Sequence, residues 1–205
     1  MASSKQRGFS LLEMMIVVAL SFTVASISYM TLIPTMNQSH VNSAYDTTLM
    51  VLRNYQNLAI TQRKRYIVTF NAPGSITVQR WDFALPVSPA PVQVAAFTLP
   101  PDVTFSVQAG YPSTAATVPD GFGAGTVALD FDQGNGLGSQ NFVMFMPDGS
   151  SQDNLGNLNS GVLYMGRAVA NDVYSSRAIS VFGATGRIRG WRLYQVAGVN
   201  TWVQQ

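Results

Sequence analysis

The sequence KQRGFSLLE, residues 5–13, leads directly into the only long apolar run of the chain, residues 14–33. Glu13, the only glutamate in the chain, therefore stands at the start of this run. A carboxylate in a membrane-spanning helix costs roughly 2.5–3.5 kcal/mol at the bilayer centre and less near the ends. Because this placement is costly, Glu13 is a candidate functional residue.

Residues 14–33 are uncharged and long enough to cross a bilayer. A helix rises ~1.5 Å per residue, so about twenty residues cross a hydrocarbon core of ~30 Å. Lys5 and Arg7 precede this run with no acidic residue beside them, and the positive-inside rule places that end in the cytoplasm. We expect the chain after Pro34 to face outward.

Three other interpretations of the apolar run compete. A secretory signal peptide would use Ser26-Ile27-Ser28 as a cut site, but an acid inside the apolar region is foreign to that pattern. A lipoprotein anchor needs a cysteine after the run, and the sequence contains none. A plain signal anchor stays open, although it gives no reason for Glu13.

Composition limits the chemistry that the chain can perform. The sequence has 12 Lys or Arg and 10 Asp or Glu, so loss of Lys5 and Arg7 would leave ten of each and a nearly neutral protein. Strong general attraction to nucleic acid or anionic lipid is not implied. With one histidine and no cysteine, the chain has no thiol nucleophile and no ligand set for a zinc cluster, and a Ser/His/Asp triad would depend on His40 alone. We therefore expect no enzymatic activity, no cofactor and no metal.

Two weaker features receive structural interpretations. His40, the single histidine, is interpreted as an exposed or capping residue rather than a base. Residues 130–136, DFDQGNG, crowd oxygen ligands and glycines into a loop. Their spacing misses the EF-hand pattern by one position and lacks its closing glutamate, so we interpret this segment as a turn.

The sequence after Pro34 keeps the spacing of a helix, and we expect a kink at that proline. Polar residues separate the apolar ones, which predicts that this part packs one face on the following domain. The apolar positions are Val41, Tyr45, Leu49, Leu52, Tyr55 and Ala59. One long helix is predicted, apolar all round to Ile33 and amphipathic afterwards.

The hydrophobic period changes at Arg65 from that of a helix to that of strands. Residues 66–70 and 76–81 predict a hairpin around a turn at residues 71–74. Three prolines make residues 85–92 a connection. Further strands are predicted at 94–98, 103–108, 126–131, 141–146, 161–165, 177–182 and 187–194. The fold class is α+β, with the long amino-terminal helix on an antiparallel β-sheet domain.

The string Gly8-Phe9-Ser10-Leu11-Leu12-Glu13, followed by a long apolar helix, resembles the processing signal of type IV prepilins and of type II secretion pseudopilins. The resemblance implies that a prepilin peptidase cuts after Gly8 and methylates the new terminus at Phe9. The apolar helix is then kept. In a filament, Glu13 would pair with the amino group of Phe9 on a neighbouring subunit, since a buried charge is tolerated mainly when paired.

The carboxyl-terminal half resembles the ending of minor pilins and pseudopilins of the GspH/FimT type. The strings that carry this second resemblance are FMPDGS at residues 145–150, AISV at residues 178–181 and GATGRIR at residues 183–189. Residues 85–125 match nothing in that pattern and are the part in which this chain is individual.

The resemblance implies a pilin-like organisation in four parts. Residues 1–8 are the leader, 9–34 the membrane-spanning and filament-core helix, 35–63 the amphipathic half of the helix, and 64–205 the outward β-rich domain. The expected function is that of a minor pilin or pseudopilin that primes assembly or lies near the filament tip. Expected partners are the prepilin peptidase, other pilin or pseudopilin subunits and the bacterial inner membrane.

Two alternative functions remain open. Some FimT-type pilins are DNA receptors for natural transformation, and the element that matches theirs here contains Arg187 and Arg189. On a strand these would share a face with Trp191, which suits phosphate contact and base stacking. Residues 63–65, RKR, are able to extend such a patch, although the positive charge also suits a helix carboxyl end. The other alternative is a signal-anchored extracytoplasmic binding domain.

Overall fold

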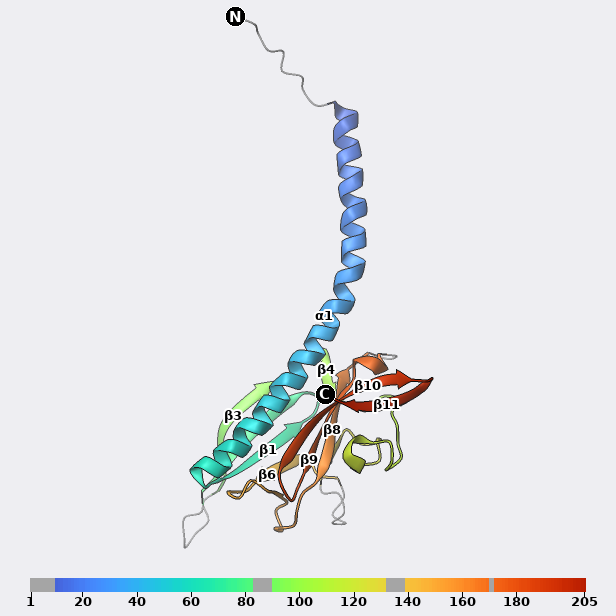
Figure 1. Cartoon of the computed structure of the whole chain (residues 1–205). Coiled ribbons are helices and arrows are strands. Elements are labelled where there is room, and N and C mark those ends of the chain that lie inside the picture. The colour runs from blue at the N-terminus through green and yellow to red at the C-terminus, as the bar shows by residue number, and fades with distance from the viewer. Residues whose placement is uncertain (1–9, 83–89, 132–138, 170–171) are drawn as a thin grey trace, which may run out of the picture. The chain divides into compact units, whose positions relative to one another are not determined.

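The computed structural model describes residues 10–82, 90–131, 139–169 and 172–205, with the backbone alone for residues 30–35. The chain divides into two units, residues 1–39 and residues 40–205. Helix α1 (Leu11–Gln62) contributes its first part to the first unit and its remainder to the second (Figure 1). The helical assignment runs through Pro34, and the kink expected there stays a prediction.

The second unit contains two antiparallel sheets. Sheet 1 has the strand order β3-β2-β1-β6-β7, and sheet 2 has the order β11-β10-β9-β8-β4, with β5 also paired to β8. The strands of sheet 1 are β1 (Arg65–Asn71), β2 (Ser75–Trp81), β3 (Val92–Thr98), β6 (Phe142–Phe145) and β7 (Ser151–Gln152). Those of sheet 2 are β4 (Val103–Phe105), β5 (Leu129–Phe131), β8 (Gly161–Arg167), β9 (Arg177–Phe182), β10 (Arg187–Val196) and β11 (Val199–Gln204).

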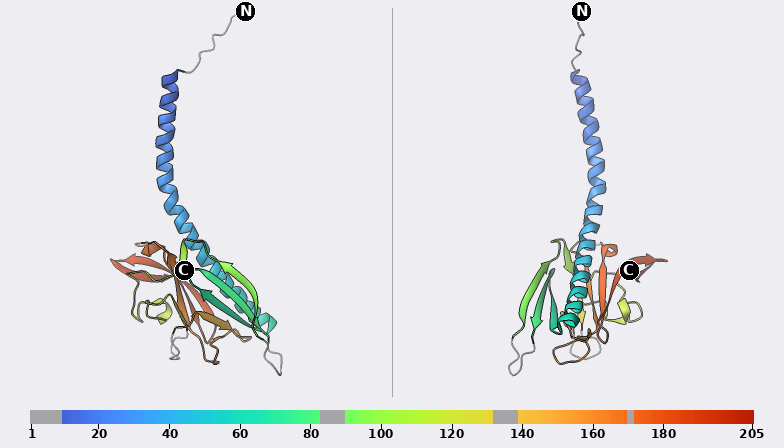
Figure 2. Two further views of the ribbon diagram at one scale, coloured as in Figure 1. Left: turned by 180° about the vertical axis from the view of Figure 1, so that it is seen from behind. Right: turned by 60° about the vertical axis from the view of Figure 1, so that its left-hand side comes forward.

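The main core lies between the second part of α1 and both sheets (Figures 1 and 2). The buried helix residues are Val41, Ala44, Leu49, Val51, Leu52, Tyr55 and Ala59. Buried residues of sheet 1 alternate along β1, as expected for a strand with one face on the core. The sheet residues in this core include Val68, Phe70, Ile76, Val78, Val143, Phe145, Leu163, Met165, Ile179 and Val181.

Sheet 2 is covered on both faces. Its outer face carries a second cluster, in which the Tyr111 ring lies 5.2 Å from that of Trp202 and 5.6 Å from that of Tyr164. Tyr111 belongs to the segment between β4 and β5, which also contains the short 3-10 helix η1 (Pro119–Gly121). Residues 85–125 matched nothing in the family pattern noted above. Part of this region therefore covers the outer face of sheet 2.

The predicted class, a long helix on antiparallel sheet structure, is confirmed. The bounds of several strands differ from the prediction. The predicted hairpin is present, and its strands extend to Asn71 and Ser75, which pair across the turn. The predicted strands at 103–108 and 126–131 are shorter, because the chain leaves the ladder after Phe105 and enters it only at Leu129. Strands β7 and β11 were not predicted, and β3 begins at Val92, inside the predicted connection at 85–92.

Gln56 connects α1 to two turns that lie far apart in the sequence. Its Nε2 donates to Gly149 O at 3.0 Å and to Thr185 O at 3.4 Å. Gly149 has φ +85° and the neighbouring Gly186 has φ +62°, a left-handed conformation that favours glycine. A side chain at Gly186 would also overlap Gly149 O and Gln56. The two turns therefore close tightly around one helix residue.

Candidate functional site

The helix begins at Leu11, and its first described hydrogen bond runs from Met14 N to Ser10 O at 3.2 Å. Glu13 lies in this first turn with its side chain exposed. Unpaired N–H groups give a helix amino terminus a partial positive charge, which favours a carboxylate there. Gly8 and Phe9, the predicted cleavage and methylation positions, lie outside the described residues.

Residues Leu11–Tyr29 form a helix long and apolar enough to cross a membrane, and none of it is buried by the residues that the structure describes. The serine and threonine hydroxyl groups in this segment bond to carbonyls of the same helix. Ser21 donates to Val17 O at 2.8 Å, and Ser26 donates to Phe22 O at 2.8 Å. Because hydrocarbon offers no partner to polar groups, this internal bonding suits a helix that serves as a membrane anchor.

The three residues predicted as a DNA-binding cluster, Arg187, Arg189 and Trp191, lie on β10. Two of them are held by contacts within the domain. Arg189 Nη1 donates to Asp120 Oδ1 at 2.7 Å, and Trp191 Nε1 donates to Ser180 Oγ at 2.9 Å. Arg187 is exposed, with its guanidinium over the Phe182 ring at 5.4 Å. Arg189 Nη1 and the Trp191 indole N–H are therefore already engaged within the domain.

Asp120 joins the members of this cluster. Ser180 Oγ donates to Asp120 Oδ2 at 2.6 Å, so one carboxylate accepts from both Ser180 and Arg189. Asp120 itself has φ +52°, a left-handed conformation that aspartate adopts more readily than most residues. The strand arginine and the tryptophan thus fasten η1 to sheet 2. The sequence gives no local signal for this partner, 69 residues before Arg189.

His40 is not a cap, which corrects one half of the interpretation from sequence; the other half, an exposed side chain, agrees with its 42% exposure. It lies inside α1, and its Nδ1 is 2.9 Å from Asp102 Oδ1. Asp102 Oδ2 also lies 3.5 Å from Arg167 Nε, and Arg167 Nη1 lies 2.9 Å from Asp172 Oδ2. The histidine therefore belongs to a chain of side-chain contacts, through Asp102, Arg167 and Asp172, that connects α1, the turn before β4 and the end of β8.

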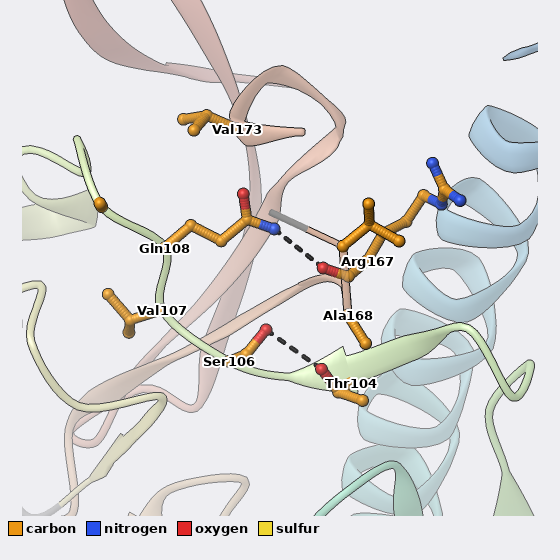
Figure 3. A pocket seen from close by; sticks show the side chains of 9 residues that line it. Thr104, Ser106, Val107, Gln108, Arg167, Ala168 and Val173 are labelled. Carbon is orange, nitrogen blue, oxygen red and sulfur yellow. Dashed lines mark hydrogen bonds between the residues drawn. The ribbon is translucent and has the colours of Figure 1, made fainter. Parts of the chain in front are cut away.

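A groove of about 310 Å³ lies beside this network (Figure 3). Gln108 Nε2 donates to Arg167 O at 2.9 Å across it, and Thr104 Oγ1 donates to Ser106 Oγ at 3.1 Å. The Arg167 guanidinium points away from the groove, where it meets Asp102 and Asp172. The lining residues offer neither a carboxylate nor an imidazole for acid–base chemistry.

The segment considered as a calcium loop is only partly described. Asp130 belongs to β5, and its Oδ1 accepts from Ser139 Oγ at 2.8 Å while its Oδ2 accepts from Ala124 N at 3.3 Å. Residues 132–136 lie outside the described part. Within the described residues, no group of three or more His, Cys, Asp or Glu side chains is arranged to hold a metal ion.

Arg177 is a buried charge that sequence reasoning missed. It is 3% exposed, and its Nη2 donates to Asn42 Oδ1 on α1 at 2.6 Å. Its Nη1 donates to the carbonyls of Ser175 and Ser176. Burial, with the nearby positive charge of Arg192, lowers the pKa of Arg177 to about 10. These contacts fix the start of β9 to the helix, which is a structural role.

Comparison with known proteins identifies the amino-terminal segment. The family model described as the prokaryotic N-terminal methylation motif matches residues 3–29. No curated protein and no solved structure matches the chain. The matched motif is the prepilin-type signal of type IV pilins and pseudopilins, and this chain carries it.

The motif and the α+β layout together support a type IV pilin-like or pseudopilin protein. The motif implies processing by a prepilin peptidase and assembly with other pilins, and the proteins that share it are structural rather than enzymatic. The apolar helix at residues 11–29 is the expected membrane anchor of such a protein.

Proposed function

We propose that this chain is a minor pilin or pseudopilin of the GspH/FimT type, a non-enzymatic subunit of a type IV pilus or a type II secretion pseudopilus. One observation carries the proposal. A single carboxylate, Glu13, occupies the first turn of an apolar helix whose residues 11–29 are not buried by any other part of the chain that the structure describes. Such a surface needs either lipid or other subunits around it.

The same helix serves two states in this proposal. Before assembly it holds the subunit in the inner membrane, with Lys5 and Arg7 on the cytoplasmic side and the domain of residues 64–205 outside. After cleavage behind Gly8 and methylation of Phe9, the apolar helices of several subunits pack together in the filament. Lipid contacts are then replaced by contacts between helices, without exposure of the apolar surface to water.

Glu13 sets the register of assembly. When the helix leaves the headgroup region for a dry filament core, an unpaired carboxylate would lose its hydration at a cost of several kcal/mol. The amino group of Phe9 on a neighbouring subunit is a cation that cleavage has just created, and it would offset this cost. Only a stagger that brings the two groups together is then favourable.

Contacts of the folded domain support the GspH/FimT assignment. The two turns that meet at Gln56, one around Gly149 and one around Thr185, belong to the two strings that resemble that type. Their sequences are therefore explained by a shared structural role on α1. We place the subunit near the filament tip, by analogy with minor subunits that prime assembly.

Mass spectrometry of the chain extracted from membranes tests the processing step. We expect an amino terminus at methylated Phe9, and Gly8→Val should leave the leader attached. An intact leader on the unaltered chain, or cleavage after Ser28, would show that the segment is an anchor or a signal peptide.

A pair of substitutions in the helix tests the assembly step. Glu13→Ala should leave the protein in the membrane and stop its incorporation into sheared filaments. Ser21→Ala is the matched control, because it removes a polar group from the same helix that bonds only to Val17 O. Normal incorporation of the Glu13→Ala chain would contradict the proposed role of the carboxylate.

A further inference from the structure

Strand β11 forms an open edge of sheet 2. It pairs with β10 through a two-residue loop, Ala197-Gly198, whose φ angles of +50° and +82° are those of a tight hairpin turn. β11 ends the strand order of its sheet, and the hairpin extends beyond the neighbouring strands in the views of Figures 1 and 2. Its register with β10 runs without a bulge from Val199 to Gln204.

The hairpin geometry fixes which backbone groups of β11 face outward. Residues that flank a two-residue loop form a hydrogen-bonded pair, and such pairs alternate along the ladder. The residues that face β10 are thus Val199, Thr201 and Val203, and the bond from Gln205 N to Gly190 O at 2.9 Å continues that series. The residues that turn their N–H and C=O to the open edge are Asn200, Trp202 and Gln204.

One face of the hairpin is apolar and exposed. Three cross-strand pairs share it: Arg192 with Val203, Tyr194 with Thr201, and Val196 with Val199. The exposed fractions are 38% for Tyr194, 53% for Val196, 64% for Val199 and 38% for Val203. The Arg192 guanidinium lies over the Tyr194 ring at 5.1 Å, so this charge borders the apolar face.

This edge lacks the usual protection against strand pairing. Proteins guard edge strands with charges, prolines or bulges. Residues 193–205 contain no charged side chain and no proline. One edge strand of sheet 1, β3, differs in this respect, because its register with β2 shifts between Val78 and Gln79. Edge and apolar face together make β11 suited to accept another strand.

We propose that β11 is the docking strand for a second copy of this chain, which adds its own β11 antiparallel across the open edge, with Thr201 opposite Thr201. The sequence VNTWV, residues 199–203, is symmetric in its valines about Thr201. Val199 of each copy then lies opposite Val203 of the other. Asn200 and Trp202, whose backbone groups face the edge, form the hydrogen-bonded pairs.

This register continues the apolar face across both copies. The central row runs from Tyr194 and Thr201 of one copy to Thr201 and Tyr194 of the other. Each row beside it runs from Val196 and Val199 of one copy to Val203 and Arg192 of the other. Threonine pairs and β-branched pairs are favourable cross-strand neighbours. No like charges meet at the edge, because the nearest charged residue, Arg192, lies on the inner strand of each copy.

Cysteine cross-linking of the full chain, purified in mild detergent, tests this pairing. The chain has no cysteine, so one introduced thiol reports only contacts between molecules. Opposed residues in a non-hydrogen-bonded antiparallel pair have Cα atoms about 4.5 Å apart, a separation that a disulfide spans. Thr201→Cys should therefore give a disulfide-linked dimer under mild oxidation. Thr98→Cys is the matched control, because Thr98 is an exposed threonine on an edge strand of sheet 1, β3.

A second substitution shows whether the apolar face is responsible. Adding Val203→Lys to the Thr201→Cys chain should lower the dimer yield about tenfold, because the ammonium group would lie against Val199 of the other copy. Val203 is exposed in one copy, so the domain should keep its melting temperature. The proposal is overturned if Thr201→Cys stays monomeric, if Thr98→Cys cross-links equally, if Val203→Lys has no effect, or if the disulfide forms to a different protein. These outcomes do not depend on the processing of Gly8 or on Glu13.

Discussion

Arg189 and Asp120 form an ion pair, with Nη1 2.7 Å from Oδ1, that fastens β10 to the segment covering the outer face of its sheet. The Asp120 side chain is 11% exposed and that of Arg189 is 31% exposed, so the contact is largely shielded from water. The same carboxylate accepts from Ser180 Oγ, which in turn accepts from Trp191 Nε1. The arginine on this strand therefore acts as a structural connection.

Loss of this connection should be visible in the stability of the domain. Arg189→Ala leaves the Asp120 carboxylate with one donor and should lower the free energy of unfolding by about 2 kcal/mol. Arg187→Ala is the matched control on the same strand, and its exposed side chain should change stability by no more than ~0.5 kcal/mol. Urea unfolding of both variants measures the difference, and equal effects would contradict the structural role of Arg189.

The same two variants bear on the DNA-receptor hypothesis, which stays a prediction. If β10 contacts DNA, Arg187→Ala should weaken binding strongly, because its guanidinium has no carboxylate partner among the described residues. The binding should also fall with rising salt concentration. A DNA shift assay at low salt that finds no binding by the unaltered chain would end this hypothesis.

Gly190 allows β10 to approach the helix. A Cβ at this position would overlap the hydroxyl and ring of Tyr45 on α1. Gly190→Ala should therefore destabilise the domain by about 1–3 kcal/mol, because the core would be overpacked. Adding Tyr45→Ala should recover part of this loss, since it removes the ring that the methyl group meets. A double-mutant cycle measures the coupling, and simple additivity would show that the contact does not decide the cost.

The local pattern was sufficient to predict the elements that depend on local sequence. The change of period at Arg65 and the turn residues 71–74 define the first hairpin, because alternation and turn chemistry are both properties of a short stretch. Strand β11 was not predicted. Its alternation is weak, since Val199 and Val203 on the exposed face are as apolar as Trp202 on the buried face. The apolar residues on the exposed face made this strand hard to predict, and the same residues make its edge a candidate docking surface.

Contacts between segments far apart in the chain could not be predicted from the sequence alone. Glu13 was predicted as a candidate because a lone acid in an apolar run is unusual by itself. Asp120 was not, since nothing near it indicates a partner 69 residues away. The contact of His40 was missed for the same reason, because its partner Asp102 is 62 residues away. A single sequence without the fold cannot bring such pairs together.

The contact between His40 and Asp102 should help to hold α1 on the domain. Asp102→Ala removes the partner of His40 and one of the two carboxylates near Arg167, and should lower the free energy of unfolding by about 0.5–1 kcal/mol, a small value because the groups are partly exposed. His40→Ala should cost less. If the two act as one contact, the double variant should cost less than the sum, which urea unfolding can measure. Strict additivity would show that they act independently.

The stability of the domain should fall in alkaline solution, because burial keeps two tyrosines of the second cluster, on the outer face of sheet 2, neutral. Burial raises the pKa of Tyr111 to about 12 and raises that of Tyr164 still further above its ordinary value of 10. Below pH 10 the phenols are neutral in both folded and unfolded chains, so the contribution is complete. As pH rises from 10 toward 12, only the unfolded chain ionises, and each group should remove about 1.4 kcal/mol of stability per pH unit.

Tyr111→Phe tests this origin, because it keeps the ring against Tyr164 and Trp202 and removes the group that ionises. The variant should lose stability less steeply than the unaltered chain above pH 10, in thermal unfolding followed by circular dichroism. Tyr174→Phe is the control, since Tyr174 is 46% exposed and should leave the slope unchanged. An equal slope in all three chains would mean that the alkaline loss arises elsewhere, because burial of the Tyr111 hydroxyl is the cause invoked and the substitution removes it alone.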